Sequence, residues 1–275
     1  MTDFGLKVRM AIVGSILFAF YMLVGGFGLL WLGTGAWPLV LVGLLVLPVI
    51  QYKIGTWSAT RKAEPMPEDG QYQEIHQMTD SLCRDMGIKK PKLMVMDMGV
   101  PNAFATGRKG KGVVVVSTEL IRLLQRDELE GVIAHELAHI KNRDVLAMVV
   151  GSSIAMMVGW VAYMVYIMSS ERGIGGIIVG MVISNIAQML VMVFVLAISR
   201  YREFVADEDA RQYIGSGDPL ARALEKIQQG NERSQDDRLD ENVSALCIFG
   251  GSKSTLAKLV STHQPVEERI RRLRS

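Results

Sequence analysis

The sequence predicts a mainly α-helical integral membrane protein, with four transmembrane helices and a water-facing α+β part that carries a small β-sheet. Hydrophobic residues make up 49% of the 275 residues, and the mean hydropathy of +0.25 is high for a soluble protein. Four segments are long, apolar and free of charge. Charged residues are still 21% of the chain and gather mainly in two blocks outside these segments. The composition therefore indicates a membrane part and a water-facing part.

Residues 10–32 form the first predicted span, because about 20 consecutive apolar residues cross a bilayer. A cleaved signal peptide is the alternative, but the apolar run is too long and lacks a small-residue cleavage site before a polar start. Residues 37–50 form the second predicted span. This run is shorter and is bracketed by Pro38 and Pro48, so a re-entrant or interfacial segment is its alternative.

Residues 145–168 and 173–199 form the third and fourth predicted spans. Neither run contains a charged residue, and only four residues join them. Two long apolar helices with so short a link predict a transmembrane hairpin. A buried helical hairpin in a soluble core is the alternative, which the length of both uncharged runs disfavours.

The distribution of basic residues predicts the orientation in the membrane. Basic residues flank the spans on one side: Lys7, Arg9, Lys53, Arg61, Lys62, Lys141, Arg143, Arg200 and Arg202. The opposite loops contain only Arg172. Because basic residues stay on the cytosolic side, we expect a multi-pass protein of the cell (inner or plasma) membrane whose termini and water-facing parts are cytosolic.

Four parts follow along the chain. Residues 1–52 form an N-terminal transmembrane hairpin, 53–144 the first cytosolic part, 145–199 the second transmembrane hairpin and 200–275 the second cytosolic part. In the first cytosolic part we expect a helix over 71–86, strands over 93–96 and 113–117, and a turn-rich segment over 101–107. The second is mainly helical, with helices over 201–213, 219–229 and 265–273 and a polar loop over 231–242.

The strongest chemical signal is a His-Glu-x-x-His pattern in a predicted helix over residues 127–140, with Asp127 as its expected N-cap. His135 and His139 are four residues apart, so they share one helix face and can bind one tetrahedral Zn²⁺. Glu136 lies beside that face and can act as general base on a water at the open coordination position. The alternative is a helix with two ordinary histidines.

A catalytic zinc site needs a third protein ligand. Glu203 is the best candidate, since it follows the fourth predicted span closely, as His139 closely precedes the third. A hairpin returns the chain to the side it left, so both segments should meet at one membrane face. Asp207, one helical turn after Glu203, could orient a zinc-binding histidine. A solvated, charged helix start is the alternative reading of this segment.

Composition also disfavours other functions. The net charge of +2 argues against nucleic acid as a partner. The two cysteines, Cys83 and Cys247, stand far apart and form neither a metal-binding spacing nor a disulfide framework. A transporter or channel would predict charges within the spans. The four spans contain no charged residue, although Asn185 and Gln188 are polar.

These motifs resemble the HtpX-type integral-membrane zinc metalloproteases, which are related to the CAAX prenyl proteases. The resemblance covers almost the whole chain and includes four apolar segments in matching places. Its motifs occur in the family's order: the helix of residues 135–139, the pair Glu203 and Asp207, the segment 102–105, and Thr262 with His263. Gln264 stands where the family usually has the first of two prolines.

The resemblance implies a zincin-like metalloprotease domain and a role for each motif. His135, His139 and Glu203 would bind one Zn²⁺ per chain, Glu136 would be the general base, and Asp207 would support a histidine. An edge strand would pair with extended substrate backbone; its residues are Asn102, Ala103, Phe104 and Ala105. His263 would stabilise the oxyanion of the tetrahedral intermediate, with a surface residue before a helix as the alternative.

The predicted function is a membrane-embedded zinc endopeptidase. Its partners would be the lipid bilayer and polypeptide substrates. The resemblance implies that these substrates are especially misfolded membrane proteins, cleaved in a stress response that maintains protein quality. Two alternatives remain. A prenyl-protein processing protease would share the site, but its family members usually have more membrane spans. A non-enzymatic membrane scaffold with structural zinc would need four protein ligands, of which the sequence offers three good candidates.

Overall fold

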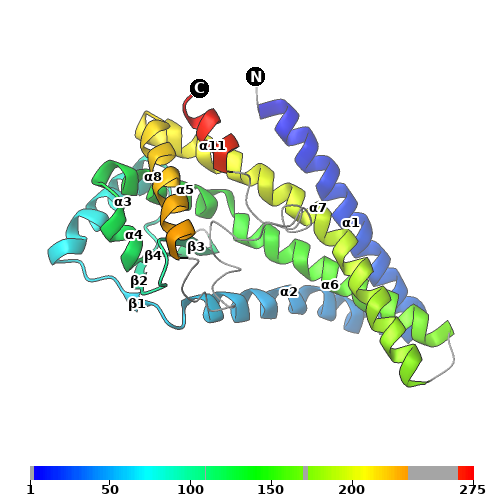
Figure 1. Cartoon of the computed structure of the whole chain (residues 1–275). Helices are drawn as coiled ribbons and strands as arrows, with labels where there is room; N and C mark the ends of the chain where they lie inside the picture. The colour runs from blue at the N-terminus through cyan, green and yellow to red at the C-terminus, as the bar shows by residue number, and fades with distance from the viewer. Residues whose placement is uncertain (1–2, 109, 170–172, 235–265) are drawn as a thin grey trace. The chain divides into compact units, whose positions relative to one another are not determined.

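The computed structural model describes residues 3–108, 110–169, 173–234 and 266–275, which are mostly helical. The chain divides into two compact units. The first contains Met1–Ile54 and Ala147–Ile198, and the second contains Gly55–Leu146 and Ser199–Ser275. Figure 1 shows the helices and strands of both units with their labels.

The first unit is built from long apolar helices: α1 (Asp3–Leu32), α2 (Trp37–Thr60), α6 (Asp144–Ser169) and the first part of α7 (Ile174–Ile214). A 3-10 turn, η1 (Thr34–Ala36), joins α1 to α2. Among the described residues, three helices are long and apolar enough to cross a membrane: Leu41–Thr60, Asp144–Ser169 and Ile174–Ile214. Phe18–Leu32 is a shorter apolar stretch of α1. Four transmembrane helices therefore stay a prediction, but several apolar helices are present.

Helices α6 and α7 pack along each other through small residues. Gly151, Ala155 and Gly159 are spaced four apart on α6, and all three are buried. A Cβ on Gly151 would lie 2.9 Å from the side chain of Val195, and one on Gly159 would lie 3.0 Å from the carbonyl oxygen of Ser184. Small residues at this spacing allow the close backbone approach that stabilises helix pairs in membranes.

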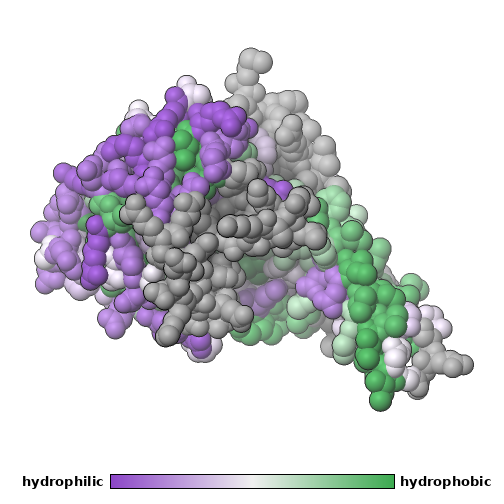
Figure 2. Space-filling view, viewed as in Figure 1, coloured by the Kyte–Doolittle hydropathy of each residue, from purple (hydrophilic) through white to green (hydrophobic). Residues whose placement is uncertain are grey.

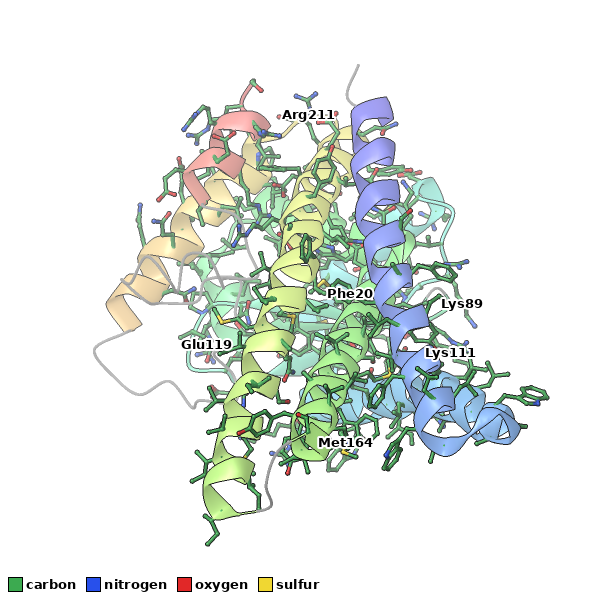
Figure 3. The ribbon with its side chains drawn as sticks, turned by 90° about the vertical axis from the view of Figure 1, so that its right-hand side faces the viewer. Phe20, Lys89, Lys111, Glu119, Met164 and Arg211 are labelled. Atoms are coloured by element: carbon green, nitrogen blue, oxygen red, sulfur yellow. The ribbon has the colours of Figure 1, made fainter. Side chains whose placement is uncertain are left out.

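The outer surface of the α6–α7 hairpin is apolar, with Met168, Ile174, Ile178 and Leu190 more than half exposed. Figure 2 shows hydrophobic residues gathered over this hairpin. In Figure 3, Met164 lies on α6 and Phe20 on α1, and Phe20 packs against the buried cluster that includes Ile154 and Val191. Such an apolar surface is typical of helices in contact with lipid.

The second unit contains a four-stranded sheet in the order β1-β2-β4-β3. Its strands are β1 (Glu64–Pro65), β2 (Lys92–Met96), β3 (Ala103–Arg108) and β4 (Lys111–Ser117). β2 pairs parallel with β4, while β1 and β3 pair antiparallel with their neighbours, so the sheet is mixed. The predicted strands 93–96 and 113–117 lie within β2 and β4.

One local prediction about the sheet is wrong. The segment 101–107, predicted as turn-rich, is largely strand β3, in agreement with the strand that the resemblance implies for 102–105. The short strand β1 lies before the first predicted helix of this unit. Gly107 has φ 91°, and a Cβ there would lie 2.4 Å from the carbonyl oxygen of Lys111. Pro101, Asn102 and Gly107 therefore mark the two ends of β3, where a turn signal and a strand end look alike in sequence.

Helices cover this sheet and complete the unit: η2 (Gly70–Tyr72), α3 (Gln73–Asp85), α4 (Thr118–Leu123), α5 (Arg126–Asn142), the second part of α7, α8 (Asp218–Ser234) and α11 (Val266–Leu273). One core joins α3, α5 and α8 to one face of the sheet, with Leu82, Ile133, Leu137 and Leu224 among its buried residues. The predicted fourth span and the helix over 201–213 are one continuous helix, α7.

The central helix α5 begins at Arg126, one residue earlier than predicted. Its N-cap is Gln125 rather than Asp127, which lies in the first turn. Gln125 and Glu128 form a capping box, in which each side chain accepts a hydrogen bond from the other's backbone N–H. Glu128 is fully buried and is also bound by Arg222 and Lys226 of α8. These contacts hold α5 firmly within the core.

Candidate active site

Helix α5 places His135 and His139 on one face, as their spacing predicts. The ring centroids are 4.7 Å apart, with planes at 87°, and the two Nε2 atoms are 3.1 Å apart. His135 is buried, and the side chain of His139 is 15% exposed. Two nitrogen lone pairs can therefore be directed at one point.

Glu203 of α7 meets these two imidazoles. Its Oε2 lies 3.5 Å from Nε2 of His135, and its Oε1 lies 3.6 Å from Nε2 of His139. The candidate ligand atoms of the three residues all lie within 4.8 Å of one another, so the cluster could hold a metal ion. The structure thus brings together the three residues that the sequence suggested as ligands.

Each imidazole also contacts a carboxylate through its other nitrogen. Nδ1 of His135 lies 2.9 Å from Oδ1 of Asp207, and Nδ1 of His139 forms a 2.6 Å hydrogen bond with Oδ2 of Asp144. A carboxylate at Nδ1 holds the proton there and leaves Nε2 as the metal-binding atom. Asp207 lies beside a candidate zinc-binding histidine, as the sequence suggested. Asp144 was not among the predicted site residues, and only the structure shows its contact with His139.

Two buried arginines complete the surroundings of the cluster. Arg269 of α11 contacts Asp207 through Nε at 2.8 Å and Nη2 at 2.7 Å, and its Nη1 lies 3.2 Å from Oε2 of Glu203. Arg202 of α7 pairs with Asp144. Sequence reasoning missed both arginines. Their charge alone gives no signal, because most arginines lie at the surface.

The balance of buried charge fits a divalent cation. Six charged side chains surround the imidazoles and are buried: Glu136, Asp144, Arg202, Glu203, Asp207 and Arg269. Four carboxylates and two guanidinium groups leave a formal charge of −2 when both imidazoles are neutral. Buried charge is costly unless it is compensated. The donor set of two imidazole nitrogens and a carboxylate, with Nδ1 contacts to carboxylates, therefore suits a zinc ion.

The two histidines differ in their acidity in the metal-free protein. Burial and the charge of Arg269 act to lower the pKa of His135, but the carboxylates of Asp207 and Glu203 outweigh them and raise it to about 9. Burial, followed by the neighbouring charge of His135, lowers the pKa of His139. One imidazole of the pair therefore holds a proton near neutral pH while the other stays neutral.

The remaining predicted residues have different outcomes. Glu136 is buried in α5, and its carboxylate acts electrostatically on His139 and Arg269, so it belongs to the same charged cluster. Ala103, Phe104 and Ala105 lie in β3, directly after the buried Asn102. His263 lies outside the described residues.

Two other residues that carry metal-binding atoms lie in α3, outside the cluster. Nε2 of His76 contacts the backbone carbonyl oxygen of Met66 at 3.2 Å. Cys83 is buried in the core, and burial together with the charge of Asp80 raises its pKa to about 11. Such a thiol is unreactive near neutral pH.

A buried helix carries the His-Glu-x-x-His pattern and faces a glutamate on a second helix, next to a small mixed sheet. Together with the long apolar helices of the chain, this site defines a membrane metalloprotease. Residues 70–275 match peptidase family M48. The chain belongs to this family, which the HtpX-type resemblance predicted.

Named relatives agree with this assignment. A Protease HtpX homolog of Halobacterium salinarum is 51% identical over 97% of this chain and 100% of its own length. Protease HtpX homologs of Pyrococcus abyssi and Thermococcus sibiricus are 36% and 37% identical, covering 98% and 80% of this chain and 96% and 77% of their own lengths.

The fold also resembles a solved structure, the crystal structure of S. mikatae Ste24p, with a TM-score of 0.58 over 97% of this chain. The two sequences are 20% identical, so this likeness shows a shared fold alone. This chain spans 63% of that protein's length.

Proposed function

We propose that this metalloprotease is a zinc-dependent endopeptidase that cleaves peptide bonds in membrane proteins, particularly misfolded ones, at the cytosolic side of the cell membrane. The observation that carries the proposal is the convergence of His135, His139 and Glu203 within 4.8 Å in a pocket of buried negative charge. The flanking basic residues support the cytosolic side, and the apolar helices support substrates that lie at the membrane.

His135, His139 and Glu203 would hold the ion, and three protein ligands leave a position open for water or substrate. A bound zinc ion would polarise the scissile carbonyl and acidify a water molecule. Glu136 would take the proton from that water and deliver it to the leaving amine. Asp207, held by Arg269, would keep Nε2 of His135 directed at the ion.

Strand β3 would bind the substrate backbone, because it is an edge of the sheet. The backbone N–H of Ser117 donates to the carbonyl oxygen of Asn102 at 2.9 Å. Asn102 and Ser117 are therefore a hydrogen-bonded residue pair of the antiparallel ladder, in which both backbone groups face the partner strand. Pairs alternate along an antiparallel ladder. With the register of β3 and β4, the N–H and C=O groups of Ala103 and Ala105 therefore point away from β4, to the open edge of β3 that no described strand pairs with.

The direct test compares Glu136→Gln with a control, Glu130→Gln, a partly buried carboxylate on the same helix. Glu136→Gln should retain zinc and lose roughly 10²–10⁴-fold in the rate of casein cleavage, the contribution of general acid–base catalysis. Glu130→Gln should cleave at the wild-type rate. Cleavage by Glu136→Gln at the wild-type rate would show that the assigned role is wrong.

Zinc content and chelation separate this function from a scaffold with structural zinc. An endopeptidase should lose cleavage when a chelator removes the ion and regain it when zinc is restored. A prenyl-protein processing protease would prefer a lipidated C-terminal peptide to the same peptide without lipid. A membrane protein with a destabilised transmembrane segment is the substrate that the proposal expects to be cut.

A further inference from the structure

We infer that Asp144 and Arg202 are a positioning pair that fixes the tautomer and orientation of His139 for metal binding. This inference rests on the proposed metal site. Asp144 is the first residue of α6, and Arg202 lies one residue before the candidate ligand Glu203 on α7. Both residues are buried.

The contact of Asp144 with His139 decides where the imidazole proton resides. Oδ2 of Asp144 lies 2.6 Å from Nδ1 of His139. A carboxylate accepts a hydrogen bond and donates none, so a neutral His139 must carry its proton on Nδ1. Nε2 then presents its lone pair toward the cluster, 3.6 Å from Oε1 of Glu203. Without Asp144, either ring nitrogen could carry the proton.

Arg202 keeps Asp144 available for this contact. Its Nη2 pairs with Oδ1 of Asp144 and donates to the backbone carbonyl oxygen of Asn142 at 2.6 Å. A buried carboxylate without a cation tends to take up a proton. The guanidinium therefore stabilises the anionic form of Asp144, and its bond to Asn142 ties it to the last residue of α5.

The backbone between α5 and α6 makes this contact possible. Arg143 adopts the left-handed conformation, with φ 59° and ψ 38°, and ends α5 four residues after His139. This conformation is unfavourable for a non-glycine residue. It reverses the chain locally, so that Asp144 faces back to the imidazole of His139. The contacts of Asp144 with His139 and Arg202 offset this strain.

Helix α7 therefore carries both the candidate metal ligand Glu203 and Arg202, the arginine that pairs with Asp144. Glu203 meets both imidazoles, and Arg202 reaches the carboxylate behind one of them. Asp207 and Arg269 make the corresponding arrangement behind His135. Each candidate zinc-binding histidine is therefore backed by an aspartate that is itself bound to an arginine.

The test measures zinc affinity of the full-length chain in detergent by competition with a chelator. Asp144→Asn should lower the affinity about 10–100-fold, the usual effect of removing such a supporting group. The matched control is Asp209→Asn. Asp209 binds Lys141 and Asn142 of the same helix without contacting an imidazole, so its loss should change zinc affinity less than about twofold.

A second readout separates positioning from a merely structural role. The chain has four histidines, so ¹⁵N-histidine spectra of the zinc-free protein contain few signals. Asp144→Asn should shift His139 from the Nδ1–H tautomer toward the Nε2–H tautomer, and Asp209→Asn should not. A lower Tm with unchanged zinc affinity and an unchanged His139 tautomer would overturn the inference. Should Asp144→Asn not fold, Arg202→Lys retains the buried charge and should lower zinc affinity about threefold or more.

The inference and the proposed function fail separately. If the wild-type chain binds zinc and Asp144→Asn weakens binding, the inference holds even when no peptide is cleaved. If wild-type cleavage depends on zinc but Asp144→Asn binds zinc like Asp209→Asn, the function holds and the inference is wrong.

Discussion

The guanidinium of Arg269 binds the carboxylate of Asp207 at two points, with Nε 2.8 Å from Oδ2 and Nη2 2.7 Å from Oδ1. Arg269 is 1% exposed and belongs to α11, near the end of the chain. Its third nitrogen, Nη1, reaches Glu203 at 3.2 Å. Helix α11 therefore holds Asp207 and Glu203 of α7 in place beside helix α5, which carries the two candidate histidine ligands.

Arg269→Met should destabilise the second unit by about 3–5 kcal/mol, because it leaves the carboxylates of Asp207 and Glu203 buried without their cation. Chemical denaturation in detergent measures this loss. Arg271→Met is the matched control on the same helix. The side chain of Arg271 is 76% exposed and pairs with Glu268, so its loss should cost less than about 0.5 kcal/mol. Equal stability of the two variants would contradict the stabilising role of Arg269.

Zinc binding should release a proton near neutral pH. The carboxylates of Asp207 and Glu203 raise the pKa of His135 to about 9 in the metal-free protein, so this imidazole is protonated at pH 7 and must lose its proton to bind zinc. The apparent dissociation constant for zinc should therefore rise about tenfold for each pH unit below 8. Calorimetry in buffers of different ionisation enthalpy counts the released protons. A pH-independent affinity between pH 6.5 and 8 would refute this.

The same pKa shift has a consequence for the stability of the metal-free protein. The folded-state pKa of His135 lies above the ordinary value of about 6.5, so protonation of this imidazole stabilises the fold. This contribution is fully present below pH 6.5 and is lost as pH rises through 9. Unfolding of the zinc-free protein at pH 6 and pH 9.5 measures it, and His135→Gln should reduce the difference.

Removing zinc should lower the Tm of the protein by several degrees. The four buried carboxylates of the cluster outnumber its two buried guanidinium groups, so without the ion the cluster keeps a net negative charge. A ligand at 100 times its Kd stabilises the folded state by about 2.7 kcal/mol. Thermal scans with a chelator, and again with excess zinc, check this. His139→Ala is the control, since its Tm should no longer respond to zinc. An identical Tm with and without zinc in the wild-type chain would rule out a stabilising ion at this site.

Ala105→Pro should impair cleavage while leaving the fold largely intact. The N–H of Ala105 points to the open edge of β3, where proline is tolerated, and its loss removes a donor for substrate backbone. One lost hydrogen bond of about 0.5–1.5 kcal/mol lowers kcat/KM roughly twofold to tenfold. Phe104→Pro is the contrasting variant, because the N–H of Phe104 faces β4 and its loss should lower Tm. Wild-type kcat/KM for Ala105→Pro would argue against substrate pairing at this edge.

Much of the site could be predicted from local sequence. The spacing of His135 and His139 suffices to place two imidazoles together, because a helix of any context puts residues four apart on one face. The apolar segments were equally readable, and α6 and α7 cover both members of the predicted second hairpin. Glu203 was reached by a topological argument, since a hairpin returns the chain to its starting side.

Other features were wrong or missed because local patterns are ambiguous there. Pro101 and Gly107 are typical turn residues, but Pro101 precedes strand β3 and Gly107 lies in its last part, and pairing with β4 decides that this segment is a strand. Asp127 is a good N-cap by residue type, but Gln125 caps α5 because Glu128 can return the hydrogen bond. The sequence contains no sign that distinguishes Arg269 from the arginines around it.

Local sequence patterns are enough to specify which chemistry is possible: a helix with two imidazoles and a carboxylate, and apolar runs long enough for a bilayer. Which charges support that chemistry depends on contacts between residues that are far apart in the chain. Arg202 meets Asp144 across 58 residues, and Arg269 meets Asp207 across 62. Pairing across such distances depends on how α5, α7 and α11 pack, and burial in that packing makes each ion pair necessary.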